Sequence, residues 1–344
     1  MTQTPAGLPK LGITLFSLTL EMRRSDYTLE GMIRRVAELD LGPGLEVVGF
    51  QSLRGWPNVS DEFATGFRGL LDECELVPTA MSMNLDLARR RDRRMTEEEA
   101  LEYVERQMEA GKKLGFPIGK SAILSTPGFV EGLARIAERL EMRFGVEVHS
   151  PESVDSPHVA HLRELFDAVG SPLLGFVPDF SASMHDVPPS LVRAHRESGM
   201  SEELIALVSE VWHSDATMPE KFGRFHEEAG KLGASPGDVG KLNMVLTMHG
   251  SMDPRRWAEL MPQVVHVHGK FYGIDESGNE PSIDHEAIMN VLVESGYDGY
   301  ISSEWEGHAY TDAMSGYEVC RGHHDLCRRL LLQSAQTAGT SRAH

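Results

Sequence analysis

Short apolar segments alternate with amphipathic helical segments along almost the whole chain, and this alternation is the feature that most restricts its fold. Alternation of this kind is typical of βα units, whose strands lie parallel in one sheet with helices packed on it. Eight segments have the length and apolar content of buried strands. They are residues 11–18, 45–50, 77–84, 117–124, 144–150, 173–180, 264–271 and 300–306.

Helical patterns fall between these strands, and several carry a start signal. Thr96 and Glu99 have the spacing of a capping box, Ser156 precedes a proline at a first helical position, and Asp284 is placed as an N-cap. The predicted helices are 28–38, 60–74, 100–114, 127–143, 157–169, 287–295 and 317–332. A doubly wound open sheet would need a glycine-rich turn after the first strand, and the sequence ITLFSLTLEM has no glycine. The pattern therefore predicts an α/β fold, a closed (β/α)8 TIM barrel.

A long helical insertion interrupts the barrel pattern between strands 6 and 7. About 80 residues separate Asp179 from Val264, whereas a βα unit needs about 30. The insertion, about 181–262, holds helical patterns at 201–212, 219–232 and 239–248, followed by a short helix that Asp253 begins. It is expected on the catalytic side of the barrel, as a lid, a pocket wall, a subunit contact or a passive excursion. We expect one domain over 1–333 and a disordered tail over 334–344.

Charge and composition narrow the classes of function. The formal net charge of −19 argues against nucleic acid or an anionic membrane as the main partner, because both attract clustered Lys and Arg. There is no apolar run of membrane-spanning length and no secretory signal pattern, so we expect a cytoplasmic protein. Three cysteines make no disulfide framework. Cys320 and Cys327 flank His323 and His324, where a buried helix is favoured over a zinc site.

Polar side chains at the ends of four predicted strands point to the chemistry. Barrel active sites form at the C-terminal ends of strands, and residues two apart share one face of a strand. On strands five to eight these residues are Glu147 and His149, then Asp179, then His266, His268 and Lys270, then Ser302, Glu304 and Glu306. Buried and unpaired, such charges would cost several kcal/mol. A divalent cation would offset them, and donor sets rich in carboxylate oxygen favour Mn2+ or Mg2+, with Co2+ and Zn2+ as alternatives.

The order of these residues resembles the sugar phosphate isomerase/epimerase, or xylose-isomerase-like, superfamily. The resemblance spans residues 11 to about 332, although only four motifs are specific. By that match the metal ligands are Glu147, Asp179, His268 and Glu304. The HGK segment at His268 resembles the superfamily's HxKD segment, which makes His268 the ligand in preference to His266 and places Lys270 at the superfamily's lysine position.

Three departures argue against an ordinary ketose 3-epimerase. Ala182 stands where those enzymes have a His after the metal Asp. Ser153 stands in place of a substrate-binding Glu, and Ile274 in place of an Arg. The sugar chemistry implied by the superfamily is therefore expected in a different form.

The long insertion, the HVHGKF segment and the SEWEG end of strand eight resemble most closely the larger subunit of bacterial C-glycoside deglycosidases. That resemblance implies cleavage of the carbon–carbon bond of 3-oxo C-glucosides. It also implies a small β-rich partner subunit in a hetero-oligomer and a divalent metal, typically Mn2+. A metal-dependent isomerase, epimerase or dehydratase acting on a sugar or inositol derivative is the alternative. An inactive scaffold is a third class, which the intact ligand set disfavours.

The expected reaction is loss of the C2 proton beside the C3 carbonyl, followed by β-elimination that releases the aglycone. His149 is the candidate base, because it shares a strand face with Glu147 and imidazole titrates near neutral pH. Glu147 and Glu304 are rival bases. Lys270, His266 and Glu306 are candidate substrate-binding residues, although Lys270 could instead pair with Glu306, and His266 could instead be packed behind the site.

Overall fold

A computed structural model describes residues 7–24 and 28–341 of the chain. Eight parallel strands form one sheet in the order β6-β5-β4-β3-β2-β1-β8-β7. Between β6 and β7 the ring closes through isolated parallel bridges, Phe176 to Val264 and Asp179 to His268. The predicted (β/α)8 barrel is confirmed. The strands are β1 (Lys10–Thr14), β2 (Gly44–Val48), β3 (Val77–Ser82), β4 (Ile118–Lys120), β5 (Arg143–Val148), β6 (Leu174–Pro178), β7 (Val267–Phe271) and β8 (Tyr300–Trp305).

Seven of the eight strands end earlier than the sequence pattern predicted, whereas β7 ends at Phe271 as predicted. The second half of the first predicted strand is a 3-10 helix, η1 (Leu15–Leu18), followed by α1 (Thr19–Arg23). The chain also turns helical after β2, in α3 (Gly49–Ser52), and after β6, in η2 (Phe180–Ala182). The side chains of Thr14 and Asp179 accept hydrogen bonds from the amides two residues on, which ends the extended run. The apolar pattern predicted the existence of each strand better than its end.

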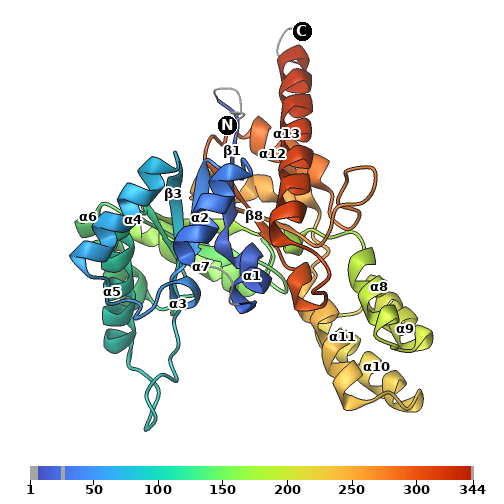
Figure 1. Ribbon diagram of the computed structural model, residues 1–344. Helices are drawn as coiled ribbons and strands as arrows, with labels where there is room; N and C mark the ends of the chain where they lie inside the picture. Colours follow the sequence, from blue (N-terminus) through green and yellow to red (C-terminus); the bar gives the residue numbers. More distant parts are fainter. Residues whose placement is uncertain (1–6, 25–27, 342–344) are drawn as a thin grey trace.

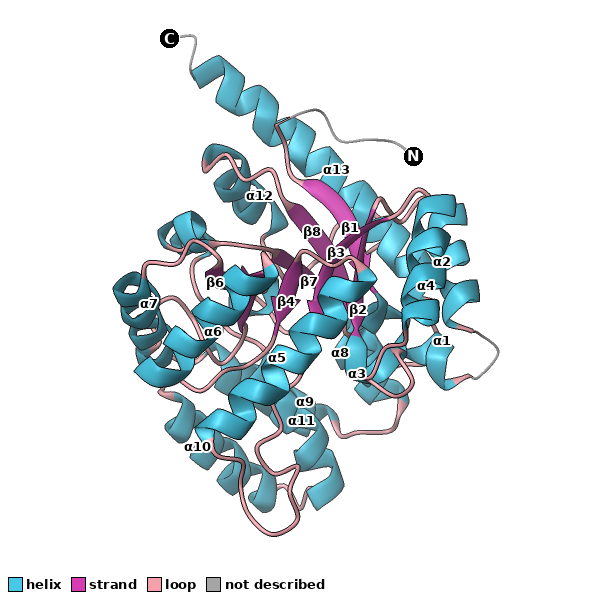
Figure 2. Cartoon of the chain, turned by 90° about the vertical axis from the view of Figure 1, so that its left-hand side faces the viewer, coloured by secondary structure: helices cyan, strands magenta, loops and turns pink. Residues whose placement is uncertain are grey.

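Helices surround the strands, and their apolar faces form one core with the outward faces of the barrel (Figure 2). Those of the barrel are α2 (Leu29–Glu38), α4 (Asp61–Glu73), α5 (Glu97–Leu114), α6 (Pro127–Leu140), α7 (Pro157–Val169), α12 (His285–Glu294) and α13 (Gly316–Ser341). The capping box of Thr96 and Glu99 and the Asp284 cap are confirmed. Ser156 stands at the N-cap of α7, but its hydroxyl accepts from the Ser153 amide instead of capping the helix.

The insertion forms four helices that extend from the C-terminal side of the barrel (Figure 1). They are α8 (Pro189–Glu197), α9 (Glu202–His213), α10 (Met218–Lys231) and α11 (Pro236–Met248), followed by the short helices η3 (Pro254–Glu259) and η4 (Met261–Gln263). The helix α8 was not predicted. Asp253 caps η3 as expected. Residues 334–341 continue α13, which differs from the disordered tail expected there, and residues 342–344 lie outside the described residues.

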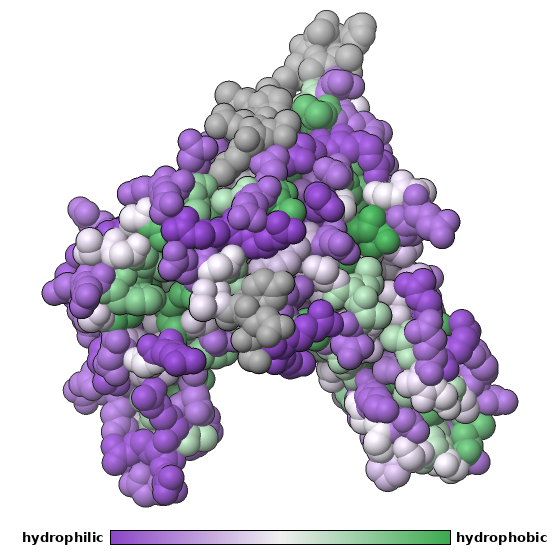
Figure 3. All heavy atoms as spheres, viewed as in Figure 1, coloured by the Kyte–Doolittle hydropathy of each residue, from purple (hydrophilic) through white to green (hydrophobic). Residues whose placement is uncertain are grey.

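Two arms project on either side of the barrel mouth, α5 with the loop before it and the helices α8–α11 (Figure 1). The molecular surface is hollowed between them (Figure 3). At the base of the second arm, the first and last residues of the insertion pair with each other. Ser183 and Ser251 form an antiparallel bridge, and the amides of Gly250 and Met252 donate to the carbonyls of Ser181 and Ala182. No helix among the described residues has the length and apolarity that a membrane span requires.

The segment from Cys320 to Cys327 lies within α13, and its cysteine and histidine side chains are buried in the protein. Cys320 and Cys327 are buried, and burial raises the pKa of the Cys320 thiol to about 12. Nδ1 of His323 lies 2.7 Å from the Ser303 hydroxyl, and Nε2 of His324 lies 3.0 Å from the Gly12 carbonyl. These partners explain the segment as helix packing, which is the interpretation the sequence favoured over a zinc site.

Candidate metal centre and active site

The barrel mouth brings together the four residues predicted as metal ligands. Glu147 lies on β5, Asp179 directly follows β6, His268 lies on β7 and Glu304 on β8. Each offers one ligand atom, and all four atoms lie within 4.8 Å of one another. Nδ1 of His268 is 3.0 Å from Oε1 of Glu147 and 3.8 Å from Oδ2 of Asp179, and it also contacts Oε2 of Glu304. Three carboxylates and one imidazole thus face one point.

The chemistry of these donors fits a divalent cation. Among the described residues, Asp179 Oδ2, His268 Nδ1 and Glu304 Oε2 are buried without a hydrogen bond of normal geometry. Ser181 leaves Asp179 Oδ2 available, because its amide (2.8 Å) and hydroxyl (2.5 Å) both donate to Oδ1. Each buried polar atom without a partner costs roughly 1–3 kcal/mol, so such atoms are rare. A divalent metal would satisfy all three atoms and offset the like charges, and this donor set suits Mn2+, Mg2+, Co2+ or Zn2+.

Glu46 lies beneath the four ligands, fully buried on β2. Its carboxylate contacts Nε2 of His268 at 2.9 and 3.0 Å and Nε2 of His266 at 3.0 Å. The hydroxyl of Ser82 donates to Glu46 Oε1 at 2.7 Å. Burial acts to raise the pKa of Glu46, but the imidazoles of His268 and His266 hold it well below its usual value. The Nε2 atom of His268, which faces away from the metal ligands, is therefore in contact with the Glu46 carboxylate.

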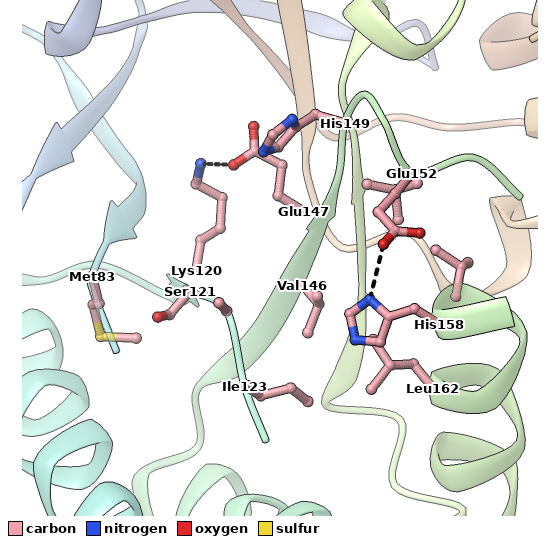
Figure 4. A pocket seen from close by; sticks show the side chains of 13 residues that line it. Met83, Lys120, Ser121, Ile123, Val146, Glu147, His149, Glu152, His158 and Leu162 are labelled. Atoms are coloured by element: carbon pink, nitrogen blue, oxygen red, sulfur yellow. Dashed lines mark hydrogen bonds and ion pairs between the residues drawn. The ribbon is translucent and has the colours of Figure 1, made fainter. Parts of the chain in front are cut away.

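Two buried lysines stand beside the acids. Nζ of Lys120 lies 2.6 Å from Oε2 of Glu147 (Figure 4). Nζ of Lys270 lies 2.6 Å from Oε2 of Glu306, 3.3 Å from Oε1 of Glu304 and 3.6 Å from Oδ2 of Asp179. Burial opposes the charged form of both lysines, yet the nearby carboxylates raise the pKa of each. Both amines therefore stay cationic and offset part of the acidic charge.

The four proposed ligands differ in how readily they hold a proton. Burial raises the pKa of Asp179 to about 6, with Lys270 opposing and Glu304 and Glu147 adding to the rise. For Glu304, burial is outweighed by His268 and Lys270, which lower its pKa to about 2. The pKa of His268 is raised well above its usual value, because Glu304 and Glu46 outweigh burial. Without a cation, a proton is therefore held at His268, at the position the metal would take.

A cavity of about 200 Å3 opens beside Glu147. Lys120, Ser121 and His149 line it with Glu147, and Ile123 and Leu162 add apolar walls (Figure 4). Nδ1 of His149 lies 2.6 Å from the carbonyl oxygen of Ser150. A carbonyl only accepts, so Nδ1 carries the proton and Nε2 of a neutral His149 is an acceptor. The candidate base thus lies next to a proposed ligand at an open edge of the site.

The three predicted substrate-binding residues lie in two different places in the structure. Glu306 and Lys270 pair with each other at the mouth, as the alternative interpretation of Lys270 expected. His266 is buried, and its Nε2 contacts Glu46 and, at 2.9 Å, the Ser302 hydroxyl. His266 therefore has polar partners inside the protein, behind the metal ligands. A contact of any of the three with substrate stays a prediction.

Sequence reasoning missed Glu46 and Lys120. Glu46 interrupts the apolar run Gly44–Val48, and an acid inside a buried strand is a signal that could have found it. Lys120 is a polar residue at the C-terminal end of the short strand β4. The same signal identified the candidate residues on strands five to eight. Both residues contact a proposed metal ligand directly.

Solved structures share this fold over nearly the whole chain. A sugar phosphate isomerase/epimerase from Parabacteroides distasonis has a TM-score of 0.52 and 14% identity, covering 96% of this chain and 95% of that one. The IOLI protein with a bound zinc atom has a TM-score of 0.51 and 14% identity, covering 95% and 98%. At such identities the likeness shows the fold alone, which is the parallel eight-stranded barrel that this chain shares with both proteins.

Sequence relatives define the family more narrowly. The 3'-dehydrocarminate deglycosidase alpha subunit of Microbacterium sp is 39% identical over 98% of this chain and 99% of its own length. The C-glycoside deglycosidase alpha subunit of Arthrobacter globiformis is 37% identical over 94% of this chain and 92% of its own. No protein-family model matches the chain. At these identities over nearly full length, the chain belongs to the family of C-glycoside deglycosidase alpha subunits.

Proposed function

We propose that this chain cleaves the carbon–carbon glycosidic bond of 3-oxo C-glycosides and releases the aglycone. The observation that carries the proposal is the cluster of Glu147, Asp179, His268 and Glu304 at the mouth of a barrel whose relatives are named for deglycosylation. A divalent metal held by these four residues, with Mn2+ the expected ion, would act as a Lewis acid that stabilises negative charge on sugar oxygens. We propose these residues as its ligands.

His149 is the proposed base. Its Nδ1 donates to the Ser150 carbonyl, which leaves Nε2 as the nitrogen that can accept a proton, and the ring lines the cavity beside Glu147. In the proposed reaction it takes the C2 proton, which the C3 carbonyl makes acidic. The C2–H electron pair forms the C1–C2 double bond, and the C1–aglycone bond breaks. The aglycone carbon keeps the electron pair of the broken C1–aglycone bond and takes up a proton. The products are an unsaturated keto-sugar and the free aglycone.

The buried cations and acids have supporting parts in this proposal. Lys120 contacts Glu147 from the cavity side, so it restricts that carboxylate to one orientation. Glu147 and Glu304 are the rival bases, but both would serve as metal ligands, which lowers their basicity. Lys270 and Glu306 form an ion pair at the mouth, where they can meet the polar groups of a sugar.

We also propose a partner subunit. The relatives are named alpha subunits, which supports a hetero-oligomer for this chain as well. The resemblance noted from the sequence implies a small β-rich subunit, and the location expected for the complex is the cytoplasm. Co-expression of the chain with a small protein encoded beside it, followed by size-exclusion chromatography, tests whether the two form one complex.

The function is tested by incubating the Mn2+-loaded chain and the candidate small subunit with a 3-oxo C-glucoside of a flavone. The expected result is free aglycone, detected by chromatography. The variants His149→Gln and Glu304→Ala should each abolish release while the protein stays folded. No release from the complete complex with a range of 3-oxo C-glucosides would overturn the proposal.

The second candidate function is isomerisation, epimerisation or dehydration of a free sugar or inositol derivative. The barrel that the chain shares with sugar phosphate isomerases and epimerases favours it. Proton abstraction next to a carbonyl serves both reactions, so the metal cluster does not separate them. Conversion of a free keto-sugar without aglycone release in the same assay would select this function.

A further inference from the structure

Three buried side chains around Lys270 have polar atoms without partners. The ring nitrogens of His249 and His308 and the hydroxyl of Tyr272 make no hydrogen bond to any residue the structure describes. His249 is 3% exposed, Tyr272 1% and His308 8%. Lys270 acts electrostatically on all three and lowers the pKa of both histidines, after the larger effect of burial. The proposed ligand atoms show the same combination of burial and missing partners.

The insertion brings the backbone at His249 close to the segment that holds Asp179. His249 follows α11, and the next residue, Gly250, donates its amide to the carbonyl of Ser181 at 2.7 Å. Ser181 is the residue whose amide and hydroxyl hold Asp179. On the other side, Nε1 of Trp212 donates to the His249 carbonyl at 2.8 Å. The backbone around His249 is therefore anchored by the segment that follows β6 and by Trp212 of α9, while its ring nitrogens are left without partners.

Tyr272 directly follows β7, two residues beyond Lys270, and its phenol is close enough to Glu306, Lys270 and Asp179 for their charges to act on its pKa. Its carbonyl accepts bonds from Trp305 Nε1, Ser190 Oγ and Tyr310, which fix its backbone. The rings of Tyr272 and His249 meet edge to face with centroids 4.8 Å apart. Two polar side chains from different segments thus adjoin each other beside the cluster.

The chemistry of the pair selects a neutral ligand with many hydroxyl groups. Burial, and then Lys270, lowers the pKa of His249 to about 3, so its ring is neutral and offers one donor and one acceptor. The phenol of Tyr272 likewise donates and accepts, and burial raises its pKa well above the usual value, so it stays protonated. Lys270 beside them is already paired with Glu306, Glu304 and Asp179, so it is not a free cationic donor for a phosphate or carboxylate, whereas the neutral donor–acceptor pair matches sugar hydroxyls.

We propose that His249 and Tyr272 bind the hydroxyl groups of the sugar ring while its oxygens at C2 and C3 face the metal ligands. This inference rests on the proposed function only for the class of substrate, a 3-oxo pyranose. It gives the insertion a role in substrate recognition, because His249 directly follows α11 of the insertion.

The test uses 3-oxo-1,5-anhydro-D-glucitol, which presents the 3-oxo ring but has nothing at C1 to expel. Binding to the Mn2+-loaded full chain is measured by calorimetry, so no cleavage is needed. Tyr272→Phe removes one hydroxyl, and His249→Phe keeps an aromatic ring against Tyr272. Each variant should weaken probe binding about 3- to 10-fold, the effect of one neutral hydrogen bond, with Mn2+ affinity unchanged.

Tyr297→Phe is the matched control. The Tyr297 hydroxyl donates to the Tyr300 carbonyl at 3.0 Å, where β8 begins, at the opposite end of the barrel from the metal ligands. Its loss should leave probe affinity unchanged. Equal probe affinity in wild type, Tyr272→Phe and His249→Phe would overturn the inference, as would a wild type that does not bind the probe. A wild type that binds the probe but cleaves no C-glucoside would instead count against the proposed function alone.

Discussion

His268 has two ring nitrogens in different surroundings, and this difference determines how it can bind a metal. Nδ1 faces Glu147, Asp179 and Glu304, whereas Nε2 faces Glu46. If Nε2 carries the ring proton and donates it in a hydrogen bond to Glu46, the lone pair of the neutral ring is on Nδ1. Glu46 is thus a positioning residue for the proposed metal ligand, and it acts through His268 without facing the ion.

Replacing Glu46 with glutamine tests this role. Glu46→Gln keeps the shape of the side chain but removes the charge that holds the Nε2 proton, so Mn2+ affinity should fall roughly 10- to 100-fold. Calorimetric titration of the metal-free protein measures it. Glu280→Gln is the control, because Glu280 is also buried but its carboxylate bonds to Ser282 and Ile283. Unchanged affinity in Glu46→Gln, or two ions bound per wild-type chain, would contradict this role.

The protons held at the site predict the pH dependence of metal binding. The raised pKa of His268 means that the ion must displace a proton at neutral pH, and the pKa of about 6 at Asp179 adds a second proton in acid. Mn2+ affinity should therefore fall as pH falls, about tenfold per pH unit near neutrality and more steeply below pH 6. Calorimetry in buffers of different ionisation enthalpy counts the released protons. A pH-independent affinity between pH 5 and 8 would contradict these pKa directions.

The same shifts act in the opposite sense on the stability of the metal-free protein. Both folded-state pKa values lie above the unfolded ones. The stabilising contribution of Asp179 is therefore complete below pH about 4 and is lost as the pH rises through about 6. That of His268 is complete below pH about 6.5 and is lost at a higher pH. Metal binding and metal-free stability thus respond to pH with opposite signs.

At the scale of elements, the insertion is tied to the barrel by close backbone contacts around Gly250. A Cβ at this position would come within 2.9 Å of the Ala182 carbonyl oxygen and 3.0 Å of its Cα. Backbone atoms cannot move aside as a flexible side chain can, so an added methyl group must displace the segment that carries His249. The close approach, and not a left-handed backbone, is the reason for glycine here.

Gly250→Ala should therefore separate substrate binding from metal binding. We expect a loss of roughly 1–3 kcal/mol in the free energy of unfolding and weaker binding of the 3-oxo probe, with Mn2+ affinity retained. Urea unfolding and calorimetry measure the two effects. Gly240→Ala, within α11, is the control, since its Cβ would meet nothing within 4 Å. It should stabilise the helix by about 0.5–1 kcal/mol. Equal stability of the two variants would show that the contact at Gly250 is loose.

The sequence predicted elements and site residues wherever a local pattern exists. Apolar runs located all eight strands, and the polar strand ends located the four residues that the structure brings together. Helix α8 begins at Pro189 after a second proline; it is short and mostly polar, and only Leu191 and His195 are buried, so no long apolar stripe marked it in the sequence. His249 follows a helix of the insertion, and Glu46 lies inside a strand. Both come close to the site only through tertiary packing. Only the assembled barrel shows their partners.

At the scale of the whole molecule, the metal site adds acids to a chain that already has a net charge of −19. Glu147, Asp179 and Glu304 are held within 4.8 Å of a common imidazole, and the lysines beside them offset only part of that charge. A divalent ion at this point would lower the electrostatic cost of folding the barrel mouth. An acidic protein also attracts divalent ions over its whole surface, so specific and diffuse binding must be told apart.

Thermal unfolding in 0.15 M salt separates the two. Mn2+ at about 100 times its Kd should stabilise the wild type by about 2.7 kcal/mol, and EDTA should reverse the effect. Glu304→Gln removes one proposed ligand, so its melting temperature should no longer respond to Mn2+. Glu306→Gln removes a neighbouring acid outside the cluster of four and should keep the response, whereas diffuse attraction would be reduced equally in both variants. An Mn2+ response that persists in Glu304→Gln would mean that the ion binds elsewhere on the acidic surface.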